Sequence, residues 1–210
     1  MARITSIIKF EGSIGKELTG SSYKGIPVLS KKIRKSAQPN TEEQRSQRAK
    51  FKLVNEMLSE AAGFTRYSFC EKGGKQFPHQ TAVAYNMKQA VGGTFPDYVI
   101  DYDKFMLGKG SQEQVTDLTV TRQTDRVEVR WTNDDMGTRA STTDVVMVAL
   151  YNESRNDWYY KTSGTTRADS QMVVYPPQKW SSDEIHCWVV TRDKLAKRVS
   201  DSDHFMLSIA

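Results

Sequence analysis

Three histidines are the first residues to test for chemistry. His79, His186 and His204 do not lie at the spacing from another His or Cys that is typical of a zinc site. His186 and Cys187 are adjacent, so in a strand their side chains point to opposite faces, and we expect one packed and one exposed residue. No nucleophile elbow or Ser-His-Asp neighbourhood is visible. We therefore predict no catalytic residue, no metal ligand, no cofactor and no enzymatic activity.

The carboxylate pairs and the glycine-rich segment predict turns rather than a calcium site or a phosphate-binding loop. The pairs Asp134-Asp135 and Asp201-Ser202-Asp203 lack the further oxygen ligands and the fixed glycine that calcium requires, so they predict turns. Spacing alone leaves a glycosidase with remote carboxylates open, but no residue points to one. The glycine-rich residues 11–25 include Lys16 without the spacing of a phosphate-binding loop, and predict hairpin turns.

Positive charge gathers near the start of the chain. Residues 1–60 hold 12 Lys and Arg against 6 Asp and Glu, whereas the remaining 150 residues hold 18 against 19. Three interpretations stay open: a solvated surface, a docking arm for other copies of the chain, and a patch at 31–52 that binds nucleic-acid phosphates. No nucleic-acid recognition motif accompanies the charge. The cations concerned are Lys31, Lys32, Arg34, Lys35, Arg45, Arg48, Lys50 and Lys52.

An aromatic run is the other candidate contact. Trp158, Tyr159 and Tyr160 follow one another in a predicted strand, so at least one side chain points outward. Exposed aromatic side chains can contact a surface ligand such as a glycan. Cross-strand packing on the outside of a sheet is the alternative explanation.

The elements that must position these residues begin with a strand at 3–10 and an extended basic arm at about 20–40. The arm contains the apolar residues Tyr23, Ile26 and Val28, and Pro27 removes a ladder donor, so we predict a strand at the edge of a sheet. An edge strand can pair with another subunit. We expect self-association or contact with an anionic partner through these three residues and the basic side chains of the arm and of the next helix.

Helical periodicity follows the arm. Residues 41–62 predict an amphipathic helix with Phe51, Val54, Leu58 and Ala61 on its inner face, ended by Gly63. On the other face of this helix, Arg45, Arg48 and Lys52 share one side. Further along we predict a loop at 64–78, a helix at 79–91, a strand at 97–107 and a linker at 108–114.

From residue 115 on, the sequence pattern changes to short strands between turns. The predicted strands fit an immunoglobulin-like or fibronectin type III-like sandwich, with Trp131 and Trp188 in its core. The fold class is therefore an α+β N-terminal unit at 1–110 followed by an all-β sandwich at 115–210. The seven strands lie at 115–121, 126–132, 144–151, 157–161, 170–175, 184–191 and about 197–207.

Length and composition limit the number of domains and indicate where the protein is located. A chain of 210 residues with 38% hydrophobic residues can bury a core in one large or two small domains. No apolar run approaches the length of a membrane span, and the first residues lack the features of a signal peptide. Cys70 and Cys187 are expected to be free, buried thiols in a reducing compartment. We therefore expect a protein of the cytoplasm, or of a particle assembled there.

Several strings resemble a known family. They are GKELTGSSYKGIPVLSKKIRK, PNTEEQRSQRAKF, AVAYN, WTND and VSDSDHF, and together they resemble an uncharacterised Bacteroidota family of unknown function, family 6266. Pro39, Gln44, Arg48 and Phe51 form the most specific part of the likeness. The same block is similar to a pattern in phage-associated structural proteins. The family resemblance implies the two-part architecture and carries no activity.

These observations favour a non-enzymatic structural or assembly protein. We expect copies of the chain to associate through the N-terminal arm, as a homo-oligomer and as a possible component of a phage-like particle. Nucleic-acid binding by the basic patch at 31–52 and surface or glycan binding by the sandwich are the alternatives. Insertion into a membrane is not expected.

Overall fold

The computed structural model describes residues 2–3, 11–23, 25–32, 41–70, 77–133 and 137–208, and of residues 2, 3 and 14 only the backbone. It divides into two compact units, Met1–Thr41 and Glu42–Ala210, each of which is described by itself. Two of the predicted contact residues, Arg34 and Lys35, lie outside the described residues, and so does the Asp134-Asp135 pair. Most of the predicted strand at 3–10 also falls outside them.

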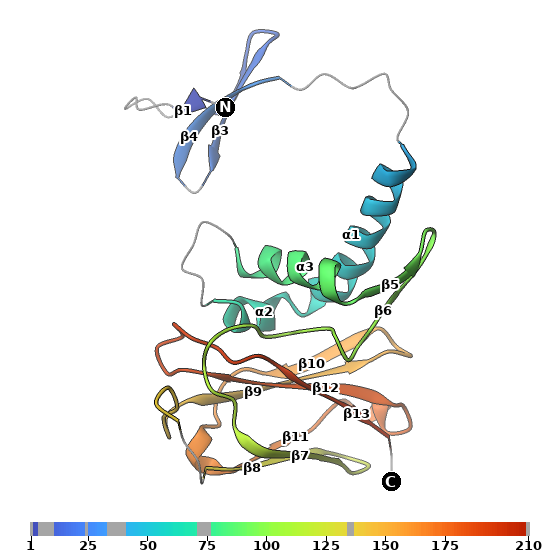
Figure 1. Ribbon diagram of the computed structural model, residues 1–210, viewed down its shortest axis with the longest axis vertical. Coiled ribbons are helices and arrows are strands. Elements are labelled where there is room, and N and C mark those ends of the chain that lie inside the picture. Colours follow the sequence, from blue (N-terminus) through green and yellow to red (C-terminus); the bar gives the residue numbers. More distant parts are fainter. Residues whose placement is uncertain are drawn as a thin grey trace. The chain divides into compact units, whose positions relative to one another are not determined.

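The first unit is a small antiparallel sheet in the order β1-β4-β3-β2 (Figure 1). Consecutive hairpins join β2 to β3 and β3 to β4, and Gly15 and Gly25 occupy their turns with φ of 60° and 76°, where a side chain would be strained. The hairpin predicted for the glycine-rich segment is confirmed. The strands are β1 Ala2–Arg3, β2 Gly12–Ile14, β3 Leu18–Tyr23 and β4 Ile26–Lys31.

The position of β4 corrects the prediction of an edge strand. β4 lies inside the sheet, because it pairs with β3 along its whole length and with β1 at Val28 and Leu29. Pro27 precedes the two residues that pair with β1, so its missing N–H removes no bond from the two described pairs. The presence of proline could not show that β4 has a neighbour on each side.

The second unit begins with three helices, α1 Glu42–Glu60, α2 Ala62–Ser68 and α3 Pro78–Gln89. The first predicted helix breaks at Ala61, so Gly63 lies inside α2 rather than after a helix, and part of the predicted loop at 64–78 is helical. The hairpin of β5 Val91–Thr94 and β6 Asp97–Ile100 follows. The strand predicted at 97–107 therefore ends at Ile100, and residues 101–115 form an irregular connection.

Seven strands then form two sheets, as the alternation predicted. One sheet has the order β11-β8-β7 and the other the order β10-β9-β12-β13. This three-plus-four arrangement of antiparallel strands is a fibronectin type III-like sandwich. The strands are β7 Thr116–Arg122, β8 Val127–Thr132, β9 Val145–Asn152, β10 Asp157–Lys161, β11 Gln171–Val174, β12 Ile185–Arg192 and β13 Asp203–Leu207.

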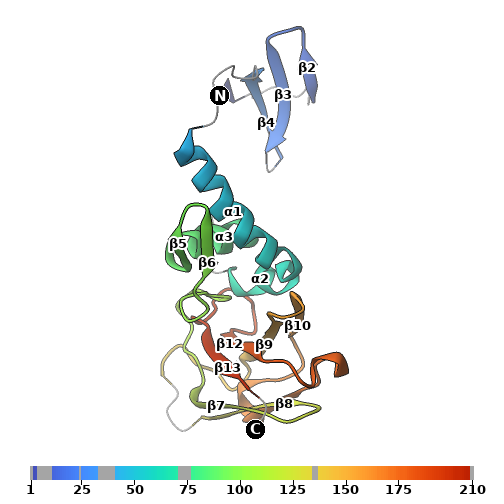
Figure 2. The ribbon, with the colours of Figure 1, turned by 90° about the vertical axis from the view of Figure 1, so that its right-hand side faces the viewer.

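The four-stranded sheet is covered on both faces. Val146, Val148 and Leu150 of β9 pack between the two sheets, whereas Met147 and Ala149 pack in a second core with the helices. Figures 1 and 2 show the helices on one face of this sheet and strands β7, β8 and β11 on the other. Covering on both faces explains why the segment VVMVALY is apolar throughout. It also explains why His186 and Cys187 are both buried, although one of them was expected to be exposed.

The helices and the sandwich therefore share a core, and the division predicted between residues 110 and 115 does not separate two cores. Val54, Leu58 and Phe64 of the helices lie in one cluster with Trp188 and Val190 of β12. The boundary between the two compact units falls after Thr41 instead. Burial of an apolar face on α1 requires partners, and the other helices together with the outer face of the sheet form the cluster that supplies them.

The predicted linker at 108–114 is a packed part of this unit. Gly108 is buried, and a Cβ atom there would lie 2.8 Å from Val190 Cγ2 and 3.1 Å from the backbone oxygen of Ser200. Gln112 is buried and donates to Asp144 at 2.8 Å. Glycine and glutamine at these positions serve close packing and buried hydrogen bonds rather than flexibility.

Candidate interaction surface

One face of the N-terminal sheet collects the three apolar residues of the predicted arm. Tyr23 pairs directly with Ile26 across the β3–β4 hairpin, and Val28 lies two residues further along β4. Residues that pair directly, or that are two apart in a strand, point to the same face. Ser21 and Ser30 lie on this face too, because they pair with Val28 and Thr19. We call Tyr23, Ile26 and Val28 the tyrosine face.

The tyrosine face is partly exposed. Tyr23 is 53% exposed, Ile26 is 37% exposed and Val28 is half-buried. Gly20 is the one buried residue among those whose burial is described in residues 11–32, and none of the described residues of this unit belongs to either hydrophobic core. A small sheet needs a buried hydrophobic face or a packing partner to be stable in water.

The opposite face of the same sheet has a different character. Leu18, 37% exposed, and Leu29, half-buried, lie there beside the exposed Lys31, which pairs with Leu18. The sheet therefore separates the predicted contact residues: Tyr23, Ile26 and Val28 come together, and Lys31 lies behind them. Lys32, which follows β4, is exposed.

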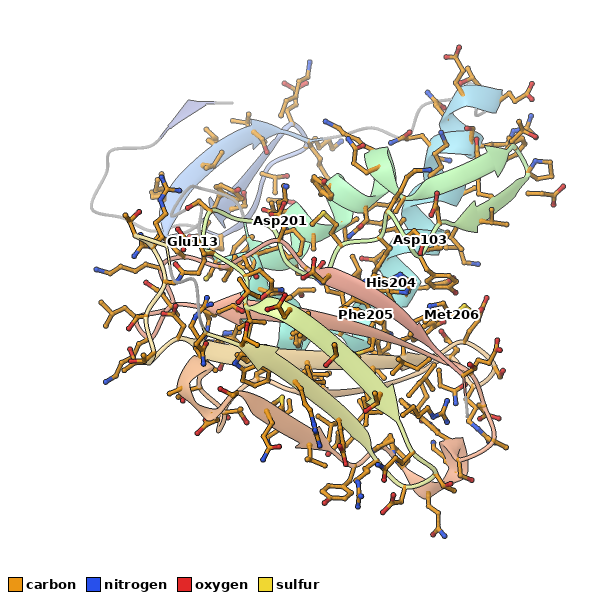
Figure 3. All side chains as sticks on the ribbon, turned by 60° about the horizontal axis from the view of Figure 1, so that its bottom comes forward. Asp103, Glu113, Asp201, His204, Phe205 and Met206 are labelled. Atoms are coloured by element: carbon orange, nitrogen blue, oxygen red, sulfur yellow. The ribbon has the colours of Figure 1, made fainter. Side chains whose placement is uncertain are left out.

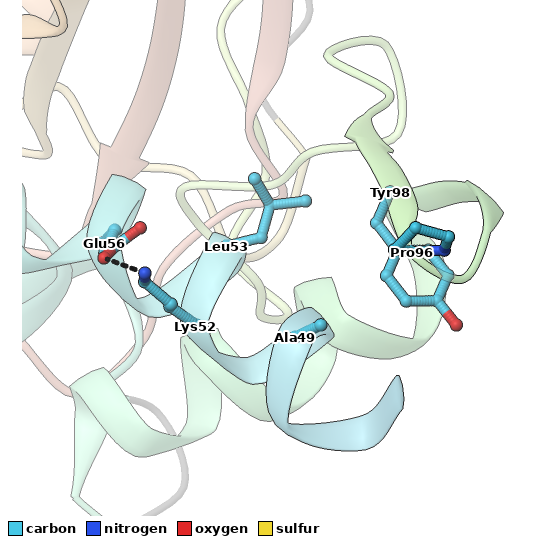
Figure 4. Close-up of a pocket in the computed structure, with 6 residues that line it drawn as sticks. All are labelled: Ala49, Lys52, Leu53, Glu56, Pro96 and Tyr98. Atoms are coloured by element: carbon cyan, nitrogen blue, oxygen red, sulfur yellow. Dashed lines mark ion pairs between the residues drawn. The ribbon is translucent and has the colours of Figure 1, made fainter. Parts of the chain in front are cut away.

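The remaining predicted cations lie on α1, in the second unit. Arg45, Arg48 and Lys52 are exposed, as their spacing on one helix predicted. Lys52 pairs with Glu56 at 3.7 Å, four residues on (Figure 4). Lys50 lies with its Nζ atom 4.9 Å from the centre of the Tyr98 ring. Such exposed pairs contribute little to stability.

Two open hollows flank this part of α1. The first, of about 250 Å³, is lined by Ala49, Lys52, Leu53, Glu56, Pro96 and Tyr98 (Figure 4). The second, of about 360 Å³, is lined by Gln44, Gln47, Arg48, Phe51 and Met87. Phe51 is 51% exposed, which corrects its prediction as an inner residue. Val54, Met57 and Leu58, in the C-terminal half of α1, are buried in the core, whereas Phe51, less than one turn before Val54, lines the second hollow.

The aromatic run is partly packed and partly exposed. Trp158 is half-buried, its Nε1 atom donates to the backbone oxygen of Met57 at 3.0 Å, and its ring lies 4.6 Å from that of Tyr151. Tyr160 packs edge-on against Phe64, with ring centres 6.0 Å apart. Tyr159 and Tyr160 remain about one third exposed. The run therefore joins β10 to the helices, and Trp158 packs against the core that they share.

A row of titratable side chains was missed because its members are far apart in sequence. His186 and His204 lie on neighbouring strands and are joined, ring nitrogen to ring nitrogen, at 3.0 Å. Asp103, from the irregular connection, lies 3.0 Å from His204. Strand alternation alone could not show that the two histidines share a face, because that also depends on the register between β12 and β13. Within the described residues, no group of three His, Cys, Asp or Glu side chains is arranged to hold a metal ion.

Two features define the class of protein: a small N-terminal β-sheet, and a fibronectin type III-like sandwich that carries helices on one sheet. The chain belongs to a protein family described as "Family of unknown function (DUF6266)", whose pattern matches residues 9–205.

Among solved structures, the chain is similar to the fn3 domain of the human collagen alpha-1(XX) chain. The identity is 13%, the TM-score is 0.35, and the match covers 49% of this chain and 90% of that one. No curated protein matches the chain. Among the described helices, none is both long and apolar enough to cross a membrane.

Proposed function

We propose that this protein is a non-enzymatic assembly protein whose copies associate through the tyrosine face of the N-terminal sheet. The observation that carries the proposal is the gathering of Tyr23, Ile26 and Val28 on one face of a sheet whose described side chains belong to neither core. A sheet that presents an apolar face is stabilised when another layer covers that face. In the proposed assembly the second layer is the same face of another copy, about 10 Å away.

An uncharged centre favours a second copy as the occupant. In β2, β3 and β4 the side of the sheet with the tyrosine face carries Ser13, Thr19, Ser21, Tyr23, Ile26, Val28 and Ser30, which are uncharged, while at its border the charged residue Arg3 of β1 pairs with Val28. A two-fold contact brings each residue near its own symmetry mate, so a charged face would repel itself. Lys31 lies on the other face and stays in water in such a pair.

The size of the face predicts a reversible contact. Complete burial of a Tyr, Ile or Val side chain contributes about 1.5–3 kcal/mol, and these three are already partly covered. Association costs roughly 4–15 kcal/mol in lost translational and rotational freedom. Three apolar residues from each copy therefore support a concentration-dependent equilibrium. A particle component of the phage-like kind would need this contact repeated, with α1 or the sandwich supplying a second one.

Sedimentation velocity over a hundredfold concentration range tests the proposal. We expect the weight-average mass of the wild-type protein to rise with concentration, and the rise to be lost in Ile26→Thr. Leu18→Thr is the matched control, because Leu18 and Ile26 are both 37% exposed but lie on opposite faces of one sheet. A monomer at every concentration, or equal loss in both variants, would count against the tyrosine face.

A further inference from the structure

A row of four side chains joins four separate segments of the second unit. Asp103 lies in the connection after β6, His204 on β13, His186 on β12, and Glu153 in the turn between β9 and β10. His204 Nδ1 lies 3.0 Å from Asp103 Oδ1, and His204 Nε2 lies 3.0 Å from His186 Nδ1. At the other end, His186 Nε2 lies 3.7 Å from Glu153 Oε2. Figure 3 shows Asp103 beside His204 on the edge strand β13.

Burial separates the middle of the row from its ends. The His186 and His204 side chains are 7% and 9% exposed, whereas Asp103 and Glu153 are 93% and 63% exposed. Tyr102 stacks on His186 with ring centres 4.0 Å apart, and Trp188 lies 4.9 Å from the His204 ring. The two imidazoles are thus enclosed by aromatic rings, while the carboxylates at both ends reach water.

The order of the hydrogen bonds fixes the proton on each ring. Asp103 only accepts when ionised, so His204 donates from Nδ1 and its Nε2 lone pair accepts from the Nδ1–H of His186. His186 Nε2 is then the free basic atom, and it faces the Glu153 carboxylate. A first added proton settles on Nε2 and keeps every bond of the row. A second proton must bind to His204 Nε2, because that is the remaining ring nitrogen without a proton. The new N–H then points at the Nδ1–H of His186, so the hydrogen bond between the rings is lost.

We propose that this row is an acid-operated latch: it holds β13 and the Asp103 connection against β12 near neutral pH and releases them when both rings are protonated. β13 is suited to release, because it is the last strand of its sheet and pairs there with β12 alone. The doubly protonated state places two imidazolium ions in contact within an enclosed site. This inference is independent of the proposed self-association.

The electrostatic surroundings give the direction of the pH dependence. Burial lowers the pKa of His186, and the neighbouring His204 lowers it further, against the attraction of Glu153. Burial also lowers the pKa of His204, against the hydrogen bond to Asp103. The other ionisable groups around the rings are Asp101, which pairs with Lys104, Tyr102 and Tyr151, whose pKa values burial raises, and Glu60, which acts on Tyr151.

Stability should therefore fall in acid. Because both folded-state histidine pKa values lie below the unfolded value of about 6.5, the unfolded chain binds more protons below that pH. The contribution is complete above about pH 6.5 and is lost as the pH falls toward the folded values. Opening should begin locally at β13, since the second proton breaks the hydrogen bond between His204 of β13 and His186 of β12.

Nitrogen-15 spectra of the imidazole rings and amide exchange from pH 8 to 5 test the latch. We expect the two rings to titrate in separate steps, and protection of β13 amides relative to β8 to fall by about tenfold per pH unit once the second proton binds. In His204→Gln this local pH dependence should vanish. His79→Gln is the control, because His79 lies on α3 outside the row.

Two results would overturn the latch. The first is independent titration of the two rings near the unperturbed value. The second is β13 protection that stays constant relative to β8 while both rings become charged. If His204→Gln does not fold, these wild-type measurements decide the question without it.

Discussion

The indole nitrogen of Trp158 donates a hydrogen bond to the backbone oxygen of Met57, 3.0 Å away. This single contact ties β10 of the sandwich to α1, across 101 residues of sequence. Through it, Trp158, which was predicted as a surface ligand contact, packs against the shared core.

Loss of the Trp158 side chain should therefore destabilise the protein. We expect Trp158→Ala to lower the free energy of unfolding by about 3 kcal/mol, because it leaves a cavity beside Tyr151 and an unsatisfied carbonyl. The adjacent Tyr159→Ala is the control and should cost less than half as much. Urea denaturation followed by circular dichroism measures both. Equal effects would mean that Trp158 does not join two layers.

Gly108 should tolerate no side chain. A Cβ atom there meets Val190 and the Ser200 backbone at 2.8–3.1 Å, so we expect Gly108→Ala to cost about 1–3 kcal/mol through overpacking. Gly92→Ala is the matched control, since its added Cβ would have an ordinary contact of 3.7 Å with Val99. Thermal unfolding of the two variants compares them. A Gly108→Ala protein as stable as the wild type would show that the connection is not packed against β12.

Arg167 and Asp144 form a buried ion pair, 3.5 Å apart and 1% and 2% exposed. Burial lowers the pKa of Arg167, against the attraction of Asp144, and its guanidinium also donates to the backbone oxygens of Glu113 and Gln114. We expect Arg167→Met alone to cost about 3–5 kcal/mol, because a buried carboxylate remains without its cation. The double variant Arg167→Met with Asp144→Leu should recover part of that loss. Additive losses in a denaturation cycle would contradict the coupling.

The two cysteines should react differently. Burial raises the pKa of the Cys187 thiol, which lies between the two sheets, whereas Cys70 is half-buried and donates to the Ala196 backbone oxygen at 3.0 Å. We expect a thiol reagent at pH 8 to modify Cys70 in the folded protein and Cys187 only after unfolding. Mass spectrometry of peptides identifies the modified residue. Rapid labelling of Cys187 without denaturant would show that the sandwich opens readily.

Local sequence patterns were sufficient to predict most of the strands and helices of the second unit. The alternation of Val127, Val129 and Trp131 predicted a strand with one buried face, and all three are buried. The regular turns predicted seven sandwich strands, and the helical spacing of Val54 and Leu58 predicted the inner face of α1. Both cysteines are free, as expected, although Cys70 is only half-buried. These predictions succeeded because each depends on neighbours within a few residues in the chain.

The sequence by itself thus determined which segments are strands or helices and which of their faces are apolar. The tertiary structure decided what covers each face. It placed helices on the outer face of β9 and β12, moved the boundary between units to Thr41, and brought His186 to His204 and Asp103. The physical reason is that periodicity reports burial but not the identity of the partner. That identity depends on strand register and on packing between residues far apart in sequence.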